Sequence, residues 1–282
     1  KEETELVLLN AGLEHVSSLW STMPYKSEEY YFLPLTPVMK RTDDLGWKPL
    51  GVQLIANLRE AHLLIPEHWR CSAKELATIC RHLEALPITR NTKHLRKLFA
   101  KYRLYLYGYY VFMTGSYYAF LKYVDGLATR KRPSDRALLG EPLFRRLIAT
   151  AREYCDEHPK VQKLEHLLRN VRRVRGRAIV FFADKSTARY CKEFLDERCI
   201  LTETVFGGVG KSMVHQREAI DALREGSITA LLATSVLHEG MSIPEVDLVL
   251  NYSVAYSSIS RLQSSGRTGR VRPGRIAHLV LD

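Results

Sequence analysis

Residues 177–182 read Arg-Ala-Ile-Val-Phe-Phe, an unbroken apolar run that predicts a strand buried on both faces. Downstream of it, short apolar strands alternate with amphipathic helices. Further strands are expected at 199–206, 229–234, 246–251 and 276–281, and helices at 186–197 and 214–225. This alternation is typical of a parallel sheet covered by helices on both faces. The predicted fold class is therefore α/β, with ligands bound beyond the carboxyl ends of the strands.

The first 170 residues follow a different pattern. Strand-like pieces occur at 6–21 and 30–35, and the pattern becomes helical after Pro49. Ser72 and Glu75 form a capping box that predicts a helix ending near Leu86. Further helices are expected at 92–127, 141–157 and 159–173. An all-helical domain therefore precedes the α/β domain.

The composition favours a polyanionic partner. The chain has 282 residues, 46% of them hydrophobic, and a formal net charge of +11. Such a balance indicates nucleic acid first and an acidic membrane second, whereas a basic solubilising surface is the alternative. The five cysteines form no Cys-x-x-Cys pair, so neither a zinc site nor a disulfide framework is expected. No apolar run is long enough to span a bilayer, and the charged start is no signal peptide.

Two phosphate-directed motifs follow the expected strands. Thr234 and Ser235 come at the end of the strand at 229–234, where hydroxyl and amide groups can meet a phosphate. An ordinary strand-to-loop transition is the alternative. The glycine-rich run 207–210 continues into Lys211 and Ser212, but the phosphate-loop pattern requires a glycine where Val205 stands. A true phosphate loop is therefore not expected there.

The run Gln263-Ser-Ser-Gly-Arg-Thr-Gly-Arg270 places Arg267 and Arg270 three residues apart, each after a glycine. Arginine is always charged and presents a rigid fork that matches phosphate oxygens. Glycine lets the backbone turn and approach a ligand closely. The run indicates a site for a polyanion, with a solvated basic turn as the alternative.

The helical part carries a second group of candidates. Residues 101–123, expected as one helix, are crowded with aromatic side chains interleaved with cations such as Lys101. They could stack on bases or line a backbone groove, but burial between neighbouring helices is favoured for most of the aromatics. The loop Arg130-Lys131-Arg132 is predicted either to contact phosphates or to be a solvated turn.

The order of these motifs resembles the second RecA-like domain of superfamily 2 helicases. The matching features are the strand at 178–182, Gln216-Arg217-Glu218, the segment 233–249 and the run 263–270. More narrowly, 243–249 and His158-Pro-Lys-Val-Gln-Lys-Leu164 look like the Hef/FANCM group, which inserts helices between its two RecA-like domains. The resemblance is specific over 158–282 and looser over 1–157.

The resemblance implies an ATP-driven DNA helicase or translocase that acts on branched or forked DNA. Arg267 and Arg270 would reach across a cleft to the nucleotide phosphates and stabilise charge on the transferred phosphoryl group, an effect worth roughly 10³–10⁵ in rate. Gln263 would help to place the nucleotide or its attacking water. ATP is the implied cofactor, with Mg²⁺ held mainly by the first RecA-like domain.

The nucleic-acid side of the site is implied in the same way. Thr234 and Ser235 would touch the nucleic-acid backbone, and Glu239 and Gly240 would couple that contact to the nucleotide. Together with Lys101, the loop Arg130-Lys131-Arg132 would contact DNA from the helical insert. The expected partners are DNA and the first RecA-like domain of the same polypeptide, with no membrane. The expected location is the cytoplasm or nucleoid of a prokaryote, or the nucleus of a eukaryote.

The resemblance divides the chain into three parts. Residues 1–48 would be the end of the first RecA-like domain and a connector, 49–157 a thumb-like helical insertion, and 158–282 the second RecA-like domain. No Walker A loop or DEAH-like box occurs in the chain, so we expect the isolated fragment to be inactive.

Three serines depart from the family pattern. Ser242 stands where the family commonly has aspartate, and Ser264 and Ser265 where it often has arginine. Two alternatives therefore stay open. One is a double-stranded RNA translocase of the RIG-I or Dicer type. The other is a non-catalytic nucleic-acid-binding scaffold derived from a helicase.

Overall fold

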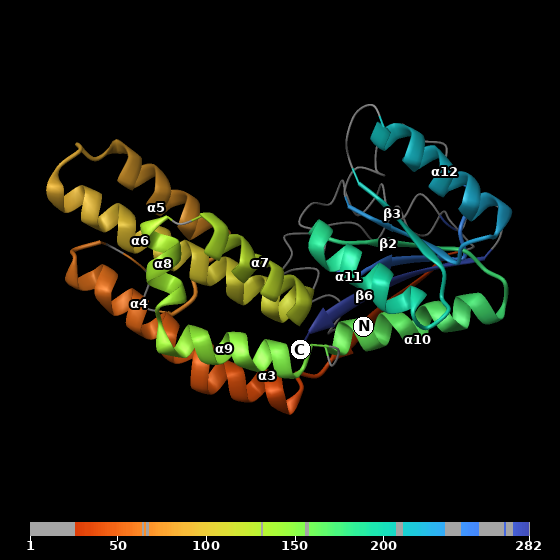
Figure 1. Ribbon diagram of the computed structural model, residues 1–282, viewed down its shortest axis with the longest axis horizontal. Coiled ribbons are helices and arrows are strands. Elements are labelled where there is room, and N and C mark those ends of the chain that lie inside the picture. Colours follow the sequence, from red (N-terminus) through yellow and green to blue (C-terminus); the bar gives the residue numbers. More distant parts are fainter. Residues whose placement is uncertain are drawn as a thin grey trace. The chain divides into compact units, whose positions relative to one another are not determined.

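The computed structural model describes residues 26–63, 65, 68–130, 132–155, 158–206, 211–234, 244–253, 268 and 273–281. They form two compact units (Figure 1). The α/β unit contains 26–33 and 162–280, and the helical unit contains 34–161.

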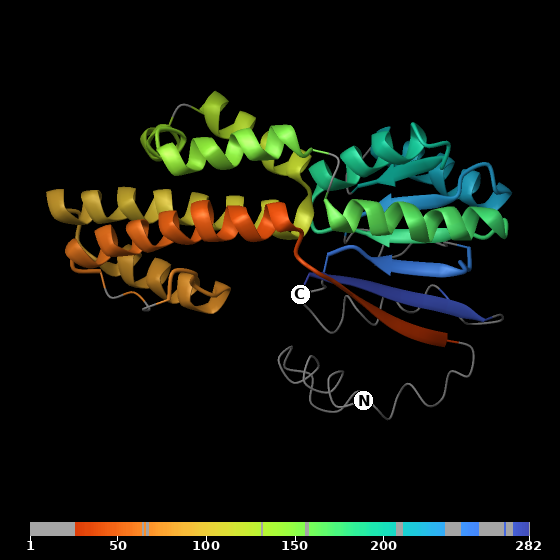
Figure 2. The same cartoon turned by 90° about the horizontal axis from the view of Figure 1, so that it is seen from below.

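The α/β unit is built on one sheet with the strand order β1-β6-β5-β2-β4-β3 (Figure 2). The strands are β1 (Lys26–Leu33), β2 (Ala178–Phe181), β3 (Thr202–Val205), β4 (Ala230–Ala233), β5 (Leu248–Asn251) and β6 (Gly274–Leu281). The central strand β2 runs parallel to both β4 and β5, with Ala178 opposite Ala230 and Leu248. The pairs β3–β4 and β5–β6 are parallel as well. The predicted parallel sheet is confirmed.

Helices cover both faces of this sheet (Figure 1). They are α10 (Pro159–Arg173), α11 (Lys185–Asp196) and α12 (Lys211–Glu225). Ile179 and Phe181 of β2 share a buried cluster with Ala219, Ile220 and Leu223 of α12. Because successive strand residues point to opposite faces, Ala178 and Val180 face the other layer, and both are fully buried. Burial on both faces explains why the strands read as continuous apolar runs.

Strand β1 joins the sheet beside β6. Arg275 of β6 donates hydrogen bonds to Glu29 (2.8 Å) and to the Tyr31 hydroxyl (3.0 Å). His278 lies 2.8 Å from Glu28, and its ring stacks on Tyr30 at 4.6 Å. The structure thus places 26–33 in the sheet of the α/β unit, whereas the sequence groups 1–48 with a preceding domain. The three-part division stays a prediction.

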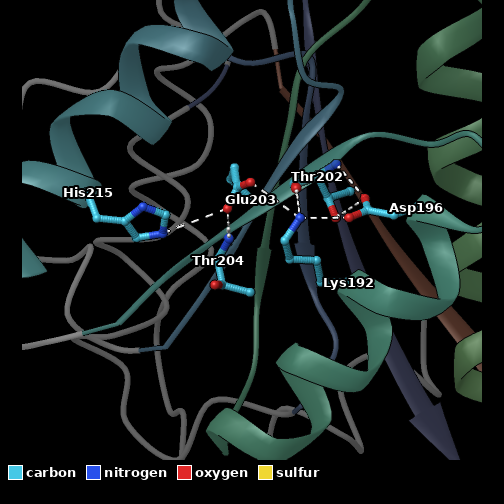
Figure 3. Close-up of polar contacts among 6 residues, drawn as sticks. All are labelled: Lys192, Asp196, Thr202, Glu203, Thr204 and His215. Carbon is cyan, nitrogen blue, oxygen red and sulfur yellow. Dashed lines mark hydrogen bonds and ion pairs between the residues drawn. The ribbon is translucent and has the colours of Figure 1, made fainter.

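The opposite edge strand, β3, carries a polar network (Figure 3). Lys192 donates hydrogen bonds to Asp196 (2.6 Å) and to the Thr202 carbonyl (2.7 Å), and its ammonium lies 3.3 Å from Glu203. Burial alone lowers the pKa of Lys192, but the Asp196 hydrogen bond and the Glu203 charge raise it above its ordinary value. Charged side chains along an exposed edge oppose pairing with another chain.

The helical unit packs around aromatic side chains. Its helices are α3 (Pro37–Thr42), α4 (Lys48–Glu60), α5 (Ala73–Ala85), α6 (Arg90–Tyr110), α7 (Tyr117–Arg130), α8 (Pro133–Leu139) and α9 (Pro142–Glu153), with π-helical turns η1 (Asp43–Trp47) and η2 (Val111–Gly115). Trp47 is fully buried and packs against Tyr105, Phe112 and Phe144 at 5.4–6.0 Å. The Tyr105 hydroxyl donates to the Trp47 carbonyl (2.7 Å). Of the ten aromatic side chains at 101–123, five are buried, four are partly buried and Tyr107 is exposed, which agrees with the favoured interpretation of packing between helices.

The single helix expected over 92–127 is wrong. The chain leaves α6 at Tyr110, passes through η2 and starts α7 at Tyr117. Ser116 has extended backbone, and its hydroxyl accepts a hydrogen bond from the Ala119 amide (3.0 Å), so it caps the new helix. Apolar residues continue across the break because both helices bury a face, and periodicity alone therefore does not reveal it.

The ends of two helices can be compared with the sequence predictions. The Ser72–Glu75 capping box at the start of α5 is confirmed. The strand expected from Cys199 begins only at Thr202, because 199–201 close the end of α11: Cys199 has φ +59° and the Ile200 amide donates to the Leu195 carbonyl (2.9 Å). No helix among the described residues has the length and apolar character needed to cross a bilayer.

Candidate functional site

The carboxyl ends of the central strands are tied together by backbone and hydroxyl contacts. The Tyr252 amide after β5 donates to the Phe181 carbonyl (3.0 Å), and the Ala183 amide donates to the Ser253 hydroxyl (3.2 Å). The Phe182 and Tyr252 rings lie 4.7 Å apart. These contacts hold the two loops that leave β2 and β5 at one rigid edge.

The neighbouring end of β3 and β4 holds a polar and an aromatic group. Thr234 follows β4, is 8% exposed, and its amide donates to the Val205 carbonyl (3.4 Å). Gln216 of α12 is buried, and its amide nitrogen donates to the Phe206 carbonyl (2.6 Å). Lys185 and Arg189 of α11 lie over the Phe206 ring at 5.8 and 5.5 Å. Cations, an aromatic ring and Thr234 therefore belong to the same edge of the sheet, a combination that suits a nucleic-acid backbone.

Thr268, the one described residue of the run 263–270, is fixed near the amino end of β5. Its side chain is fully buried, and its hydroxyl donates to the carbonyl of Val246, just before β5. Neither the Thr268 contact nor the Gln216 side-chain contact can be read from the sequence, since each partner is ten or more residues away.

Two buried titratable groups near these strands have no role in proton transfer. Burial raises the pKa of the Cys191 thiol and of the Tyr252 hydroxyl well above their ordinary values. Both stay neutral at physiological pH, so neither is suited to proton transfer there.

Most of the predicted site residues lie outside the described residues. They are Gln263, Arg267 and Arg270 on the nucleotide side, and Ser235, Glu239, Gly240 and Lys131 elsewhere. Thr234 is placed at the carboxyl end of β4, as expected. The roles of all these residues stay predictions.

Two of the side chains predicted to contact DNA from the helical insert form contacts within the protein instead. Lys101 forms an ion pair with Glu141, which leaves its side chain 13% exposed. Arg130 donates to the Gly126 carbonyl (2.9 Å) and lies 4.0 Å from Asp135. Arg132, just before α8, is exposed. Of the described pair Arg130 and Arg132, the latter is thus the freer to meet a phosphate.

A further set of cations lies at the start of α6. Arg90, Lys93, His94 and Lys97 are all exposed. Arg96, between them, is turned inward and donates to the carbonyls of Leu83 (2.8 Å) and Leu86 (3.1 Å). The sequence signal is the spacing of basic residues at i, i+3, i+4 and i+7, which places them on one helix face. The sequence analysis looked instead at the aromatic half of this helix.

Metal ligands are not grouped in the part of the chain that the structure describes: no cluster of three His, Cys, Asp or Glu side chains could hold an ion there.

Comparisons with known proteins agree with this geometry. Residues 159–272 match the helicase conserved C-terminal domain family. The chain is 35% identical over 136 residues to the ATP-dependent DNA helicase mph1 of Neurospora crassa, covering 44% of this chain and 12% of the relative. It is 31% identical over 135 residues to the ATP-dependent DNA helicase fml1 of Schizosaccharomyces pombe, covering 44% and 16%. The chain thus matches less than a quarter of the length of these relatives.

A solved structure extends the similarity to the whole chain. The Pyrococcus furiosus Hef helicase domain superposes with a TM-score of 0.73 over 98% of this chain and 61% of its own, at 23% identity. That likeness shows the RecA-like fold. Together, the domain match, the relatives and this structure show a likeness to superfamily 2 helicases of the Hef/FANCM group.

Proposed function

We propose that this chain is the second RecA-like domain and helical insertion of an ATP-dependent DNA helicase or translocase that acts on branched or forked DNA. The observation that carries the proposal is the carboxyl edge of the sheet, where Lys185 and Arg189 of α11 lie over the Phe206 ring. Thr234 and Phe206 belong to the same edge. Nucleic-acid contacts would then share one rigid support.

The chain would supply one half of an ATP site. Arg267 and Arg270 would donate to the phosphates across a cleft to the first RecA-like domain, and Gln263 would help to place the nucleotide. Glu239 and Gly240 would link that cleft to the nucleic-acid contact made by Thr234 and Ser235. Mg²⁺ would be held mainly by the first RecA-like domain, where it would balance phosphate charge. Closure of the two domains on ATP and their release after hydrolysis would give stepping.

ATP hydrolysis by the full-length protein tests this proposal. Replacing Arg267 or Arg270 with Gln should lower DNA-stimulated hydrolysis by roughly 10³-fold, because developing phosphate charge loses a donor. Arg224→Gln is the control, since Arg224 lies in the last turn of α12 and pairs with Asp221. Unchanged hydrolysis in both arginine variants would favour a non-catalytic scaffold, the alternative that the serines at 242, 264 and 265 support.

Duplex RNA is the second candidate substrate. A putative ATP-dependent RNA helicase of Methanocaldococcus jannaschii is 28% identical over 169 residues, covering 57% of this chain and 22% of the relative. Competition between forked DNA and duplex RNA of matched length would separate the two, and a clear preference for RNA would replace DNA in the proposal. The proposed location is the cytoplasm or nucleoid in a prokaryote, or the nucleus in a eukaryote.

A further inference from the structure

Helix α6 is unusually one-sided in charge. Its 21 residues include six Lys or Arg and no Asp or Glu. Arg90, Lys93, His94 and Lys97 lie within one face, because i, i+3, i+4 and i+7 are neighbours on a helix surface. Helix rise places Arg90 and Lys97 about 10 Å apart along the axis, the length over which a duplex presents about six phosphates.

The three permanent cations of this face are uncommitted among the described residues. No ion pair or side-chain hydrogen bond there engages Arg90, Lys93 or Lys97. This separates them from Lys101 and Arg96 of the same helix, which bind Glu141 and backbone carbonyls. The groove beside the face is lined by Asn57, Glu60, His62, Arg90, Asn91 and His94, among others, and so includes a single acid.

The position of these cations at the amino end of α6 destabilises the helix. The amino end of a helix has a positive dipole, so cations there are unfavourable. The first turn of α6 nevertheless contains no acid, and Arg90 and Lys93 stand in its place. The Thr92 amide at this end already donates to the Thr89 hydroxyl (3.2 Å). The groups available to a ligand here are therefore the basic side chains and not the Thr92 amide.

The arginine-rich end of α10 shows what a purely structural basic cluster looks like. Arg172 and Arg173 occupy its last turn, where cations offset the negative end of the dipole. That cluster has an explanation within the fold, whereas the cations of α6 have none.

We propose that the exposed face formed by Arg90, Lys93 and Lys97, with His94 beside them, contacts the phosphodiester backbone of a duplex nucleic-acid arm. The contact reads charge and shape, not sequence. This inference rests on the proposed nucleic-acid substrate, and it moves the main contact of the helical unit from the predicted Lys101 and the loop at 130–132 to α6.

Binding of a fluorescent forked DNA to the 282-residue chain tests the inference by anisotropy across a salt series. The test variant is Arg90→Gln/Lys93→Gln/Lys97→Gln. The matched control is Arg172→Gln/Arg173→Gln/Arg175→Gln, which removes the same charge from exposed positions at the end of α10. Arg90→Lys, which keeps the charge, is a second control and should bind as the parent does. Circular dichroism checks that all variants are folded.

We expect the α6 variant to bind about tenfold more weakly at physiological salt and the α10 variant to bind as the parent does. The slope of log K against log salt should fall by about 2.7, because each lost phosphate contact removes about 0.9. The parent would then lose roughly 40-fold more affinity than the α6 variant between 50 and 200 mM salt. Equal losses in both triple variants, or none in the α6 variant, would overturn the inference while leaving the proposed function standing. A parent chain that fails to bind any DNA or RNA would instead overturn the nucleic-acid substrate itself.

Discussion

The start of α6 and the end of α10 carry the same kind of charge at opposite ends of a helix. Arg90 and Lys93 stand in the first turn of α6, and Arg172 and Arg173 in the last turn of α10. The helix dipole opposes the first pair and stabilises the second. A basic cluster therefore indicates function only where the helix dipole does not already explain its position. The cluster at the start of α6 meets this condition, and the cluster at the end of α10 does not.

Lys160 extends the comparison of basic residues at helix ends to a side chain that is buried. Lys160 stands in the first turn of α10, is 2% exposed, and burial lowers its pKa to about 7. The unfolded chain keeps the Lys160 proton up to its ordinary pKa of 10.5, so above pH 7 the unfolded state binds more protons than the folded state. Stability should rise by roughly 2 kcal/mol from pH 7 to pH 9, at up to about 1.4 kcal/mol per pH unit.

Chemical denaturation at pH 7, 8 and 9 measures this rise, and Lys160→Met should abolish most of it. His158 next to it does not interfere, because burial lowers its pKa to about 3 and it stays neutral throughout. An equal rise in the Met variant would assign the pH dependence to another group.

Charge reversal at the end of α10 should destabilise the protein. Arg172→Glu/Arg173→Glu places two negative charges at the negative end of the dipole and should cost roughly 1–2 kcal/mol of the free energy of unfolding at low salt. Urea denaturation at 20 and 500 mM salt measures the loss, which should shrink at the higher salt because exposed charges are screened. A salt-independent loss would point to packing instead.

The same reversal at the start of α6 should have the opposite sign. Arg90→Glu/Lys93→Glu places acids where the dipole favours them and should raise the free energy of unfolding by about 1 kcal/mol. Arg90→Gln/Lys93→Gln should lie between parent and reversal. If stability instead falls in both variants, these side chains stabilise the fold and the comparison with α10 fails.

The smallest effect is expected at Arg175, which follows α10. It has φ +52°, and the Gly176 amide donates to the Val171 carbonyl (2.9 Å), a closure that usually places glycine at this position. Gly226 occupies the equivalent place after α12, with φ +80°. Arg175→Gly should raise the melting temperature by a few degrees, equivalent to about 0.5–1 kcal/mol, because an arginine is strained in the left-handed region. Arg175→Ala, which keeps the strain and removes the guanidinium, should not raise it.

The features that could be predicted from the sequence are those that local patterns encode. The apolar run at 177–182, the Ser72–Glu75 capping box and the order of motifs up to 263–270 are all contained in short stretches of sequence. They predict the parallel sheet, individual helix starts and the likeness to helicases. Each depends on neighbouring residues only, so no partner from elsewhere in the chain is needed to recognise it.

Contacts between distant residues decided the rest. Glu141 engages Lys101 across 40 positions, the Val246 carbonyl holds Thr268 across 22, and β1 completes the sheet beside β6. The break between α6 and α7 likewise hides within a continuous apolar pattern. The sequence by itself determined the sheet, the likeness to helicases and the basic balance of this protein. Only the tertiary structure decided which cations are free to meet a phosphate, because that depends on which carboxylates and carbonyls folding brings to them.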